Sequence, residues 1–367
     1  MCGRVRTRPL FGDAVKVRGE KEMKREKDYN IEFLRVLSCI FVVCIHVANV
    51  YSRSYETIGM SAYVFSVLVN TVCRISVPIF FMISGALLIE QDVNIKKNTQ
   101  RVLGIIKPLI GWSLVYAVCN FFYMGKGYDL QVLFAEPVKK HLWYLYALAG
   151  LYITLPFWQK LFQGISDSMV KYFVVLWIGL LGIDYTLALL DMRIKYPIPL
   201  VGSSCYLGYF LIGYVLRHYK DRIRIPRNVC IAIAVALLAF ITASTVYQSV
   251  NRGYHYEEYL EYRNVLLGIA AMCVFFAVIS HKPLNFSDKT RCWLELISKH
   301  SFTIYLAHII FLDIVRKEIN IPLITSWIGI PVFAFVVFGA TMLFAYVFDN
   351  AKKYVNIEAL FARHRQQ

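Results

Sequence analysis

The sequence predicts an all-α fold: a polytopic membrane protein with about ten transmembrane helices and with both termini in the cytoplasm. Of its 367 residues, 58% are hydrophobic and only 17% are charged, and the mean hydropathy is +0.51. Soluble domains carry about a quarter charged residues, and disordered chains are poorer still in apolar residues. Both classes are therefore excluded, and the apolar residues fall in blocks of membrane length.

Ten apolar segments are each long enough to cross about 30 Å of hydrocarbon, and runs of this kind can only be helices inside a bilayer. They are predicted at 31–51, 62–89, 102–124, 141–160, 169–190, 198–219, 229–250, 263–281, 300–316 and 327–348. The second segment is long and is expected to tilt or break near Pro78. The fourth and ninth segments are short and polar, and they leave the count open by one.

The helical bundle is predicted to occupy residues 29–350, between an N-terminal extension at 1–28 and a cytoplasmic basic tail at 351–367. The extension is basic and has no apolar periodicity, so it is expected to be disordered, and it lacks the apolar core of a signal peptide. A short basic lead from Met23 precedes the first helix, which makes Met23 a candidate for the true start. The alternative is a tail that touches anionic lipid.

Basic residues are distributed unevenly between the two sets of loops. With the N-terminus in the cytoplasm, 27 Lys and Arg residues fall on the cytoplasmic side and 10 on the other. Cytoplasmic loops of membrane proteins carry such an excess, which predicts that both termini are cytoplasmic. The bias also explains the net charge of +16. A nucleic-acid partner is not expected, because no basic stripe with stacking aromatic residues is found.

The nine cysteines form no CxxC pair, and seven of them lie in apolar blocks. Cysteine in such a block behaves as a small hydrophobic residue. Neither a disulfide framework nor a metal site is therefore expected, and no bound cofactor is predicted.

Arg35 and His46 are the strongest functional candidates, because an ionisable residue within a membrane helix is costly. They are eleven residues apart, so they share one helix face and lie about 16 Å apart along the axis. Glu32, one turn before Arg35, can steady its guanidinium. The alternative is that Arg35 snorkels to the surface and His46 makes a helix–helix hydrogen bond. Their common face favours a functional pair.

Arg74 lies in the middle of the second segment, too deep to snorkel, so it needs a partner or a water-filled cavity. A structural ion pair with Asp184 or Asp313 explains it as well as a ligand role does. Further along the same segment, Ser84 and Gly85 allow a neighbouring helix to approach closely.

Two histidines stand in later segments. His141 opens the fourth segment beside Trp143, where an interfacial aromatic belt explains the tryptophan better than the histidine. His308 lies within the ninth segment, where a packing role is as compatible as a catalytic one. At the cytoplasmic start of the third segment, Lys97, Arg101 and Lys107 either follow the positive-inside bias or neutralise a phosphorylated ligand.

Four blocks of the sequence, in the same order, resemble the integral-membrane acyltransferase family 3, whose members O-acylate cell-surface sugars. The most specific block is Arg35 followed after ten residues by His46, which is similar to the family's hallmark pair. The others are Val-Pro-Ile-Phe-Phe-Met-Ile-Ser-Gly at 77–85, His-Leu-Trp-Tyr-Leu at 141–145, and Ser-Phe-Thr-Ile-Tyr-Leu-Ala-His at 301–308. The third block is most like the branch with the enterobacterial common antigen O-acetyltransferase. One departure is a missing second arginine after Arg101.

The resemblance implies an acyl-CoA donor, most simply acetyl-CoA, as a co-substrate, and a sugar or glycolipid acceptor. It also implies a multi-pass protein of the bacterial inner or plasma membrane, in contact with the lipid bilayer; the oligomeric state stays open. The implied catalytic residues are His46 and Arg35, and His46 could act as a base or carry the acyl group. The implied donor-binding residues are Arg101, Lys97, Lys107 and Arg74. The implied acceptor-side or supporting residues are His141, Trp143, Ser84, His308 and Glu32.

Two other function classes stay open. A transporter or flippase for a lipid-linked or free glycan would use the same polar axis without chemistry, and it should not turn over acetyl-CoA. A membrane scaffold or sensor would use the buried charges only structurally, and it should tolerate replacement of His46 by alanine.

Overall fold

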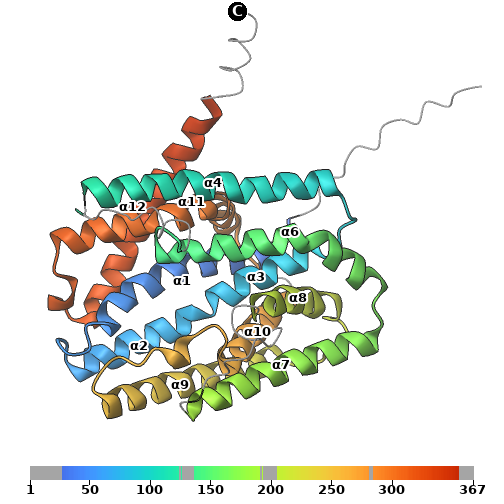
Figure 1. Ribbon diagram of the computed structural model, residues 1–367, viewed down its shortest axis with the longest axis horizontal. Helices are drawn as coiled ribbons and strands as arrows, with labels where there is room; N and C mark the ends of the chain where they lie inside the picture. The colour runs from blue at the N-terminus through green and yellow to red at the C-terminus, as the bar shows by residue number, and fades with distance from the viewer. Residues whose placement is uncertain are drawn as a thin grey trace, which may run out of the picture.

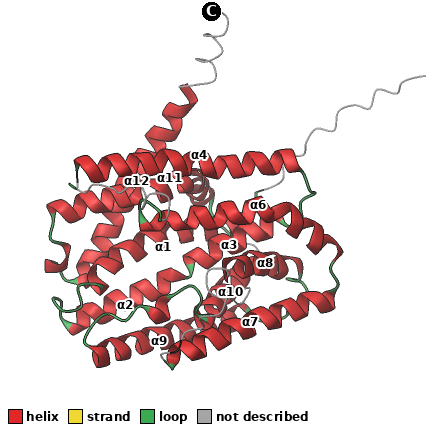
Figure 2. Cartoon of the chain, in the orientation of Figure 1, coloured by secondary structure: helices red, strands yellow, loops and turns green. Residues whose placement is uncertain are grey.

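The computed structural model describes residues 27–123, 125, 136–190, 192, 205–280 and 284–354, and within these ranges every regular element is a helix (Figure 2). The all-α class is therefore confirmed. The expected N-terminal extension and C-terminal tail lie almost wholly outside the described residues. The elements are α1 Tyr29–Ser52, α2 Met60–Arg74, α3 Ser76–Leu88, α4 Ile95–Phe122, η1 Lys140–Leu142, α6 Trp143–Gly164, α7 Asp167–Leu189, α8 Cys205–His218, α9 Arg227–Arg252, η3 Glu258–Leu260, α10 Val265–Ile279, α11 Asp288–Glu318, η4 Ile321–Leu323 and α12 Ser326–Tyr354.

Seven helical segments of the described chain are long and apolar enough to cross a membrane, which makes the protein a multi-pass membrane protein. Each of the seven overlaps one of the ten segments predicted from sequence. The remaining three predictions correspond to α6, α8 and α11, which are not among the seven. The seven are Tyr29–Ser52, Met60–Leu88, Ile95–Phe122, Asp167–Leu189, Arg227–Arg252, Glu258–Ile279 and Ser326–Lys352.

The first helix occupies the interior of the bundle, where α1 contacts α2, α3, α10, α11 and α12. Its start is fixed by Asp28, whose carboxylate accepts hydrogen bonds from the backbone N–H groups of Asn30 and Ile31. Glu32 adds negative charge to the first turn, where it interacts favourably with the helix dipole. Residues along α1 therefore meet protein on several sides rather than lipid.

The long second segment breaks into α2 and α3 at Ile75, three residues before Pro78. Proline has no N–H, and its ring clashes with the carbonyl four residues earlier, which here belongs to Arg74. The expected break near Pro78 is therefore confirmed. It makes Arg74 the last residue of α2, inside the bundle, with 8% of its surface exposed.

Close backbone contact joins α3 to α8. A Cβ atom at Gly85 would overlap the carbonyl oxygen of Phe210, and one at Gly213 would overlap the carbonyl of Met82. Small residues of this kind let membrane helices pack backbone to backbone. The expected close approach at Gly85 is therefore confirmed.

Two further helix pairs flank this centre. In Figure 1, α4 and α6 run side by side along one edge of the bundle, while α7 and α9 lie along the opposite edge. The α11 and α12 helices pack on each other and on α1. This arrangement brings α1, α11 and the η1 turn before α6 to one region of the interior.

Candidate active site

Three histidines from three distant elements meet inside the bundle. The ring centroids of His46 on α1 and His308 on α11 are 5.0 Å apart, and that of His141 on η1 is 5.2 Å from His308. The His46 and His141 centroids are separated by 6.2 Å. The structure thus brings together three residues that the sequence singled out separately.

The protonation of His308 is fixed by its own helix. Its Nδ1 lies 2.6 Å from the carbonyl oxygen of Tyr305, and a carbonyl oxygen can only accept, so Nδ1 carries the proton of the neutral ring. The Nε2 atoms of both His308 and His141 are buried and have no hydrogen-bond partner among the described residues. A neutral imidazole with a free nitrogen can accept a proton, which is the property required of a general base.

Two tyrosines hold the histidine cluster in position. Tyr305 donates a short hydrogen bond from its hydroxyl to the carbonyl oxygen of His141. Tyr116 of α4 packs edge-on against the His141 ring at 5.2 Å, and its hydroxyl donates to the carbonyl of Leu306 at 2.7 Å. Buried tyrosines use both their rings and their hydroxyls in this way. The η1 turn is therefore fixed to α11 and α4.

Arg35 lies towards the other end of α1, in contact with α11. Its Nη1 atom donates to a Glu32 carboxylate oxygen and to the hydroxyl of Ser298, both at 3.1 Å. Ser298 in turn donates to the same carboxylate. The guanidinium is thus oriented by one residue of its own helix and one of α11.

Two other predicted site residues share a neighbour with Arg35. Tyr152 of α6 interacts with Ser84 of α3 and, electrostatically, with both Arg35 and Arg101. Asn98 of α4 donates to the carbonyl oxygen of Tyr152 at 2.7 Å, which fixes α4 against α6. Three residues that were predicted for different roles, Arg35, Arg101 and Ser84, therefore lie around one tyrosine.

The structure does not bring Lys97 and Lys107 to that group. Both are exposed on α4. Lys107 is two residues from the buried Leu109, and two residues turn a helix by about 200°, so Lys107 faces away from the packed side.

Arg74 lies at the His46 end of the bundle rather than with Arg101. Its Nε donates to Asn70 at 2.9 Å, and Asn70 donates to Asn49 of α1, one turn beyond His46. Its guanidinium lies 5.6 Å from the centroid of the Tyr262 ring, in a cation–π contact. These hydrogen bonds link Arg74 to α1 one turn from His46.

The suggested structural ion pairs of Arg74 are not formed. Asp184 pairs instead with Arg263 at 3.4 Å, and Asp313 pairs with Lys139 at 2.7 Å. Trp143, the remaining predicted site residue, packs beside the Tyr262 ring, with ring centroids 5.5 Å apart.

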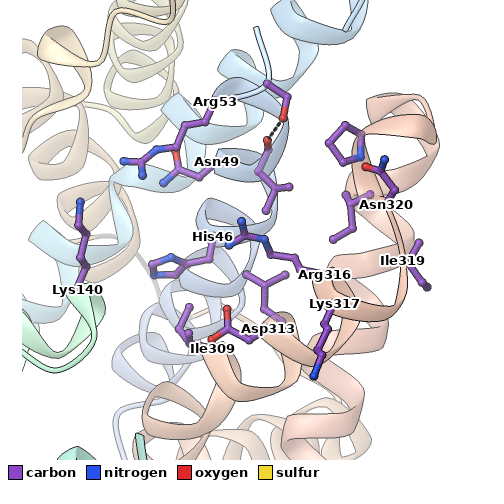
Figure 3. Close-up of a pocket in the computed structure, with 15 residues that line it drawn as sticks. His46, Asn49, Arg53, Lys140, Ile309, Asp313, Arg316, Lys317, Ile319 and Asn320 are labelled. Carbon is purple, nitrogen blue, oxygen red and sulfur yellow. Dashed lines mark hydrogen bonds between the residues drawn. The ribbon is translucent and has the colours of Figure 1, made fainter. Parts of the chain in front are cut away.

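An open cavity of about 640 Å³ reaches the histidine cluster (Figure 3). His46 is half-buried and lines it, whereas His141 and His308 do not. The cavity, called the basic cavity below, is also lined by Asn49, Val50, Arg53, Ser54, Lys140, Ile309, Leu312, Asp313, Arg316, Lys317, Ile319, Asn320, Ile321 and Pro322. His46 is thus the member of the cluster that a ligand in this cavity would meet.

The histidine cluster has no metal-binding arrangement. Among the residues that the structure describes, no group of three His, Cys, Asp or Glu side chains is placed to hold a metal ion. An imidazole of the cluster can take part in proton transfer or act as a nucleophile.

One buried polar cluster was missed by the sequence reasoning. His300 is fully buried, its Nδ1 lies 2.7 Å from Asp349 of α12, and Thr303 donates to the same carboxylate at 2.8 Å. These contacts join α11 to α12. The available signal was the spacing of His300 and Thr303, which puts both on one face of a helix.

Comparisons with known proteins identify relatives along most of the chain. A family model described as an acyltransferase domain matches residues 28–349. Proteins of Staphylococcus aureus strains MSSA476 and MW2, each described as a probable poly-beta-1,6-N-acetyl-D-glucosamine export protein, are 22% identical to this chain over 304 residues. The alignment covers 79% of this chain and 83% of each relative. No solved structure matches the chain.

Proposed function

This chain belongs to the acyltransferase family whose model covers residues 28–349, and on that premise we propose that it is a membrane O-acyltransferase, most simply an O-acetyltransferase. An acyl group passes from cytoplasmic acyl-CoA to a hydroxyl of a cell-surface or lipid-linked sugar. Acetyl-CoA acts as a co-substrate. The proposal includes ten spans, with α6, α8 and α11 also crossing the bacterial plasma membrane, and both termini in the cytoplasm.

One observation carries the proposal: His46 borders the open basic cavity on one side and the buried histidine pair on the other. A sugar hydroxyl is a poor nucleophile until a base takes its proton, and imidazole has a suitable pKa for this task. His46 takes the proton from the hydroxyl as the oxygen attacks the thioester carbonyl. The C–S bond then breaks, and the CoA thiolate leaves and receives the proton.

Arg74 supplies positive charge near the reacting carbonyl. The attack puts negative charge on the carbonyl oxygen, and fixed donors aimed at that oxygen lower the barrier. The short chain of hydrogen bonds from Arg74 through Asn70 to Asn49 holds the guanidinium next to α1. This role differs from the donor-binding role expected from sequence, and it follows from the nearness of Arg74 to His46.

The donor approaches from the Arg35 end of α1. The CoA moiety is highly anionic, and arginine binds phosphate through paired N–H groups. Arg35 and Arg101 both act on Tyr152, which supports a shared role for them in holding the donor. The thioester arm then extends about 16 Å along α1 to reach His46.

Mass spectrometry of cell-surface glycans tests the proposal. A deletion strain should lose an acyl-sized mass from one glycan, and the full-length chain should restore that mass. Restoration by a chain with His46 replaced by glutamine, at equal membrane levels, would count against the proposal.

Glycan export is a second candidate function, favoured by the description of the Staphylococcus aureus relatives. An exporter would use the same polar interior to pass a sugar chain without breaking the thioester. Acetyl-CoA turnover by the purified protein separates the two functions, because an exporter leaves acetyl-CoA intact while still moving glycan into inverted vesicles.

A further inference from the structure

The basic cavity contains positive charge that the protein itself does not neutralise. Its one lining carboxylate, Asp313, is paired with Lys139 at 2.7 Å, and its lining Arg53 is paired with Glu257 at 3.0 Å. No carboxylate of the described residues lies within 4 Å of Lys140 or Arg316. Lys140 and Arg316 are therefore among the lining cations that no carboxylate of the described residues neutralises.

These two cations stand on different elements around the cavity. Lys140 belongs to η1 and Arg316 to the last turn of α11. In the view of Figure 3, Arg316 extends across the cavity towards the side where His46 lies, whereas Lys317 points away. Lys317 is also occupied, because its Nζ donates to the carbonyl of Tyr123 at 2.8 Å. Arg316 and Lys140 thus line the cavity from two different elements.

These two cations are predicted to lie on the side of the membrane that the positive-inside bias of the chain disfavours. The cavity lies at the end of α1 that is predicted to face away from the cytoplasm, where Lys and Arg are depleted in membrane proteins. The positive-inside bias therefore does not explain the unpaired cations at this end of the bundle. A negatively charged ligand provides one.

We propose that the basic cavity binds the acceptor through an anionic group, either a carboxylate on an acidic sugar or a phosphate of a lipid-linked one. Arg316 and Lys140 hold this group, and the amides of Asn49 and Asn320 are available to neighbouring hydroxyls. A volume of about 640 Å³ is within the usual range of ligand pockets. The inference rests on the proposed function for the hydroxyl presented to His46, whereas binding itself requires no transfer.

The test measures equilibrium binding to the full-length protein in phosphatidylcholine nanodiscs at low salt. The probes are a hyaluronan tetrasaccharide, which carries glucuronate, a neutral β-1,6-linked N-acetylglucosamine tetrasaccharide, and inorganic pyrophosphate. Arg316→Gln and Lys140→Gln remove the two cations. Lys220→Gln is the matched control, because Lys220 is an exposed lysine outside the cavity.

At least one anionic probe should bind about tenfold more tightly than the neutral probe, and added salt should weaken that binding. Each cavity variant should weaken anionic binding about three- to tenfold and leave neutral binding unchanged. A preference for the hyaluronan probe identifies a carboxylate, and a preference for pyrophosphate identifies a phosphate. Equal binding of all probes, or equal effects of the cavity variants and Lys220→Gln, overturns the inference.

Acetyl transfer measured on the same preparations separates the inference from the proposed function. If the protein transfers acetyl groups but does not prefer the anionic probes, the inference of an anionic acceptor is overturned and the proposed acyltransferase function is not. Anion preference without acetyl-CoA turnover supports the binding site and counts against the acyltransferase.

Discussion

The imidazole rings of His46 and His308 lie with their centroids 5.0 Å apart, although 262 residues separate them in the chain. Only His46 of this pair lines the basic cavity. The Nδ1–H group of the buried His308 donates a hydrogen bond to the carbonyl oxygen of Tyr305. Its Nε2 lies within the cluster and has no hydrogen-bond partner among the described residues. This division predicts different roles: His46 meets substrate, and His308 acts through His46.

Replacing His46 with glutamine should lower the rate of acyl transfer by about 10²–10⁴, because the loss of a general base has that effect. The measurement is transfer of labelled acetyl from acetyl-CoA to the membrane glycan fraction, at matched protein levels. His218→Gln is the control, since His218 is exposed and pairs with Glu90 away from the cluster. Activity of the His46 variant within a few-fold of wild type would rule out the base.

Two basic residues of α4, Arg101 and Lys107, provide a variant and a matched control for the donor site. Arg101→Gln should raise the apparent KM for acetyl-CoA about tenfold and leave that for the acceptor unchanged, because a charged hydrogen bond to phosphate is lost. Lys107→Gln removes an equal charge from the exposed face of the same helix and should change neither value. If both variants raise the KM for acetyl-CoA, the charge acts at long range and Arg101 makes no specific contact.

Candidate site residues could be singled out from the sequence, but their arrangement in space could not. Charge in hydrocarbon is costly, so His46 and Arg35 are conspicuous in any apolar run. The sequence does not show which helices contact each other, because the interior side and the lipid-facing side of a membrane helix are both apolar. For this reason the sequence gives no sign that His141 and His308 meet His46.

Two details of the arrangement could not be read from the sequence for the same reason. Sequence proximity grouped Lys107 with Arg101, yet six residues turn a helix by about 600°, so the two side chains point in different directions. A search for a carboxylate partner linked Arg74 to Asp184 or Asp313, whereas its partner is the neutral Asn70 one turn earlier. The break near Pro78 and the contact at Gly85 were predictable, because both depend on local backbone chemistry.

Gly85→Ala should destabilise the bundle. The added methyl group would overlap the carbonyl oxygen of Phe210, so α3 and α8 must move apart, and overpacking of this kind costs about 1–3 kcal/mol. Gly104→Ala on α4 is the control, because no atom lies within 4 Å of its added Cβ, and alanine favours a helix. Thermal unfolding in detergent should show a lower Tm for Gly85→Ala and an unchanged or higher Tm for Gly104→Ala.

The loop between α9 and η3 should make stability dependent on mildly acidic pH. Burial lowers the pKa of His255 from 6.5 to about 4, with Arg53 and Arg74 opposing protonation and Glu257 favouring it. His255 also lies 2.9 Å from the hydroxyl of Tyr63 on α2, which joins the loop to the bundle. The ring is therefore neutral in the folded protein at neutral pH.

The sign of the effect follows from proton binding. Between pH 6.5 and about 4 the unfolded chain binds the His255 proton and the folded chain does not. Stability from this group is therefore complete above pH 6.5 and is lost progressively as the pH falls towards 4, by about 3 kcal/mol at most. Tm measured in detergent from pH 7.5 down to pH 4.5 should fall more steeply for wild type than for His255→Gln. Parallel curves for the two proteins would show that His255 is not the group responsible, because glutamine has no proton to gain over this range.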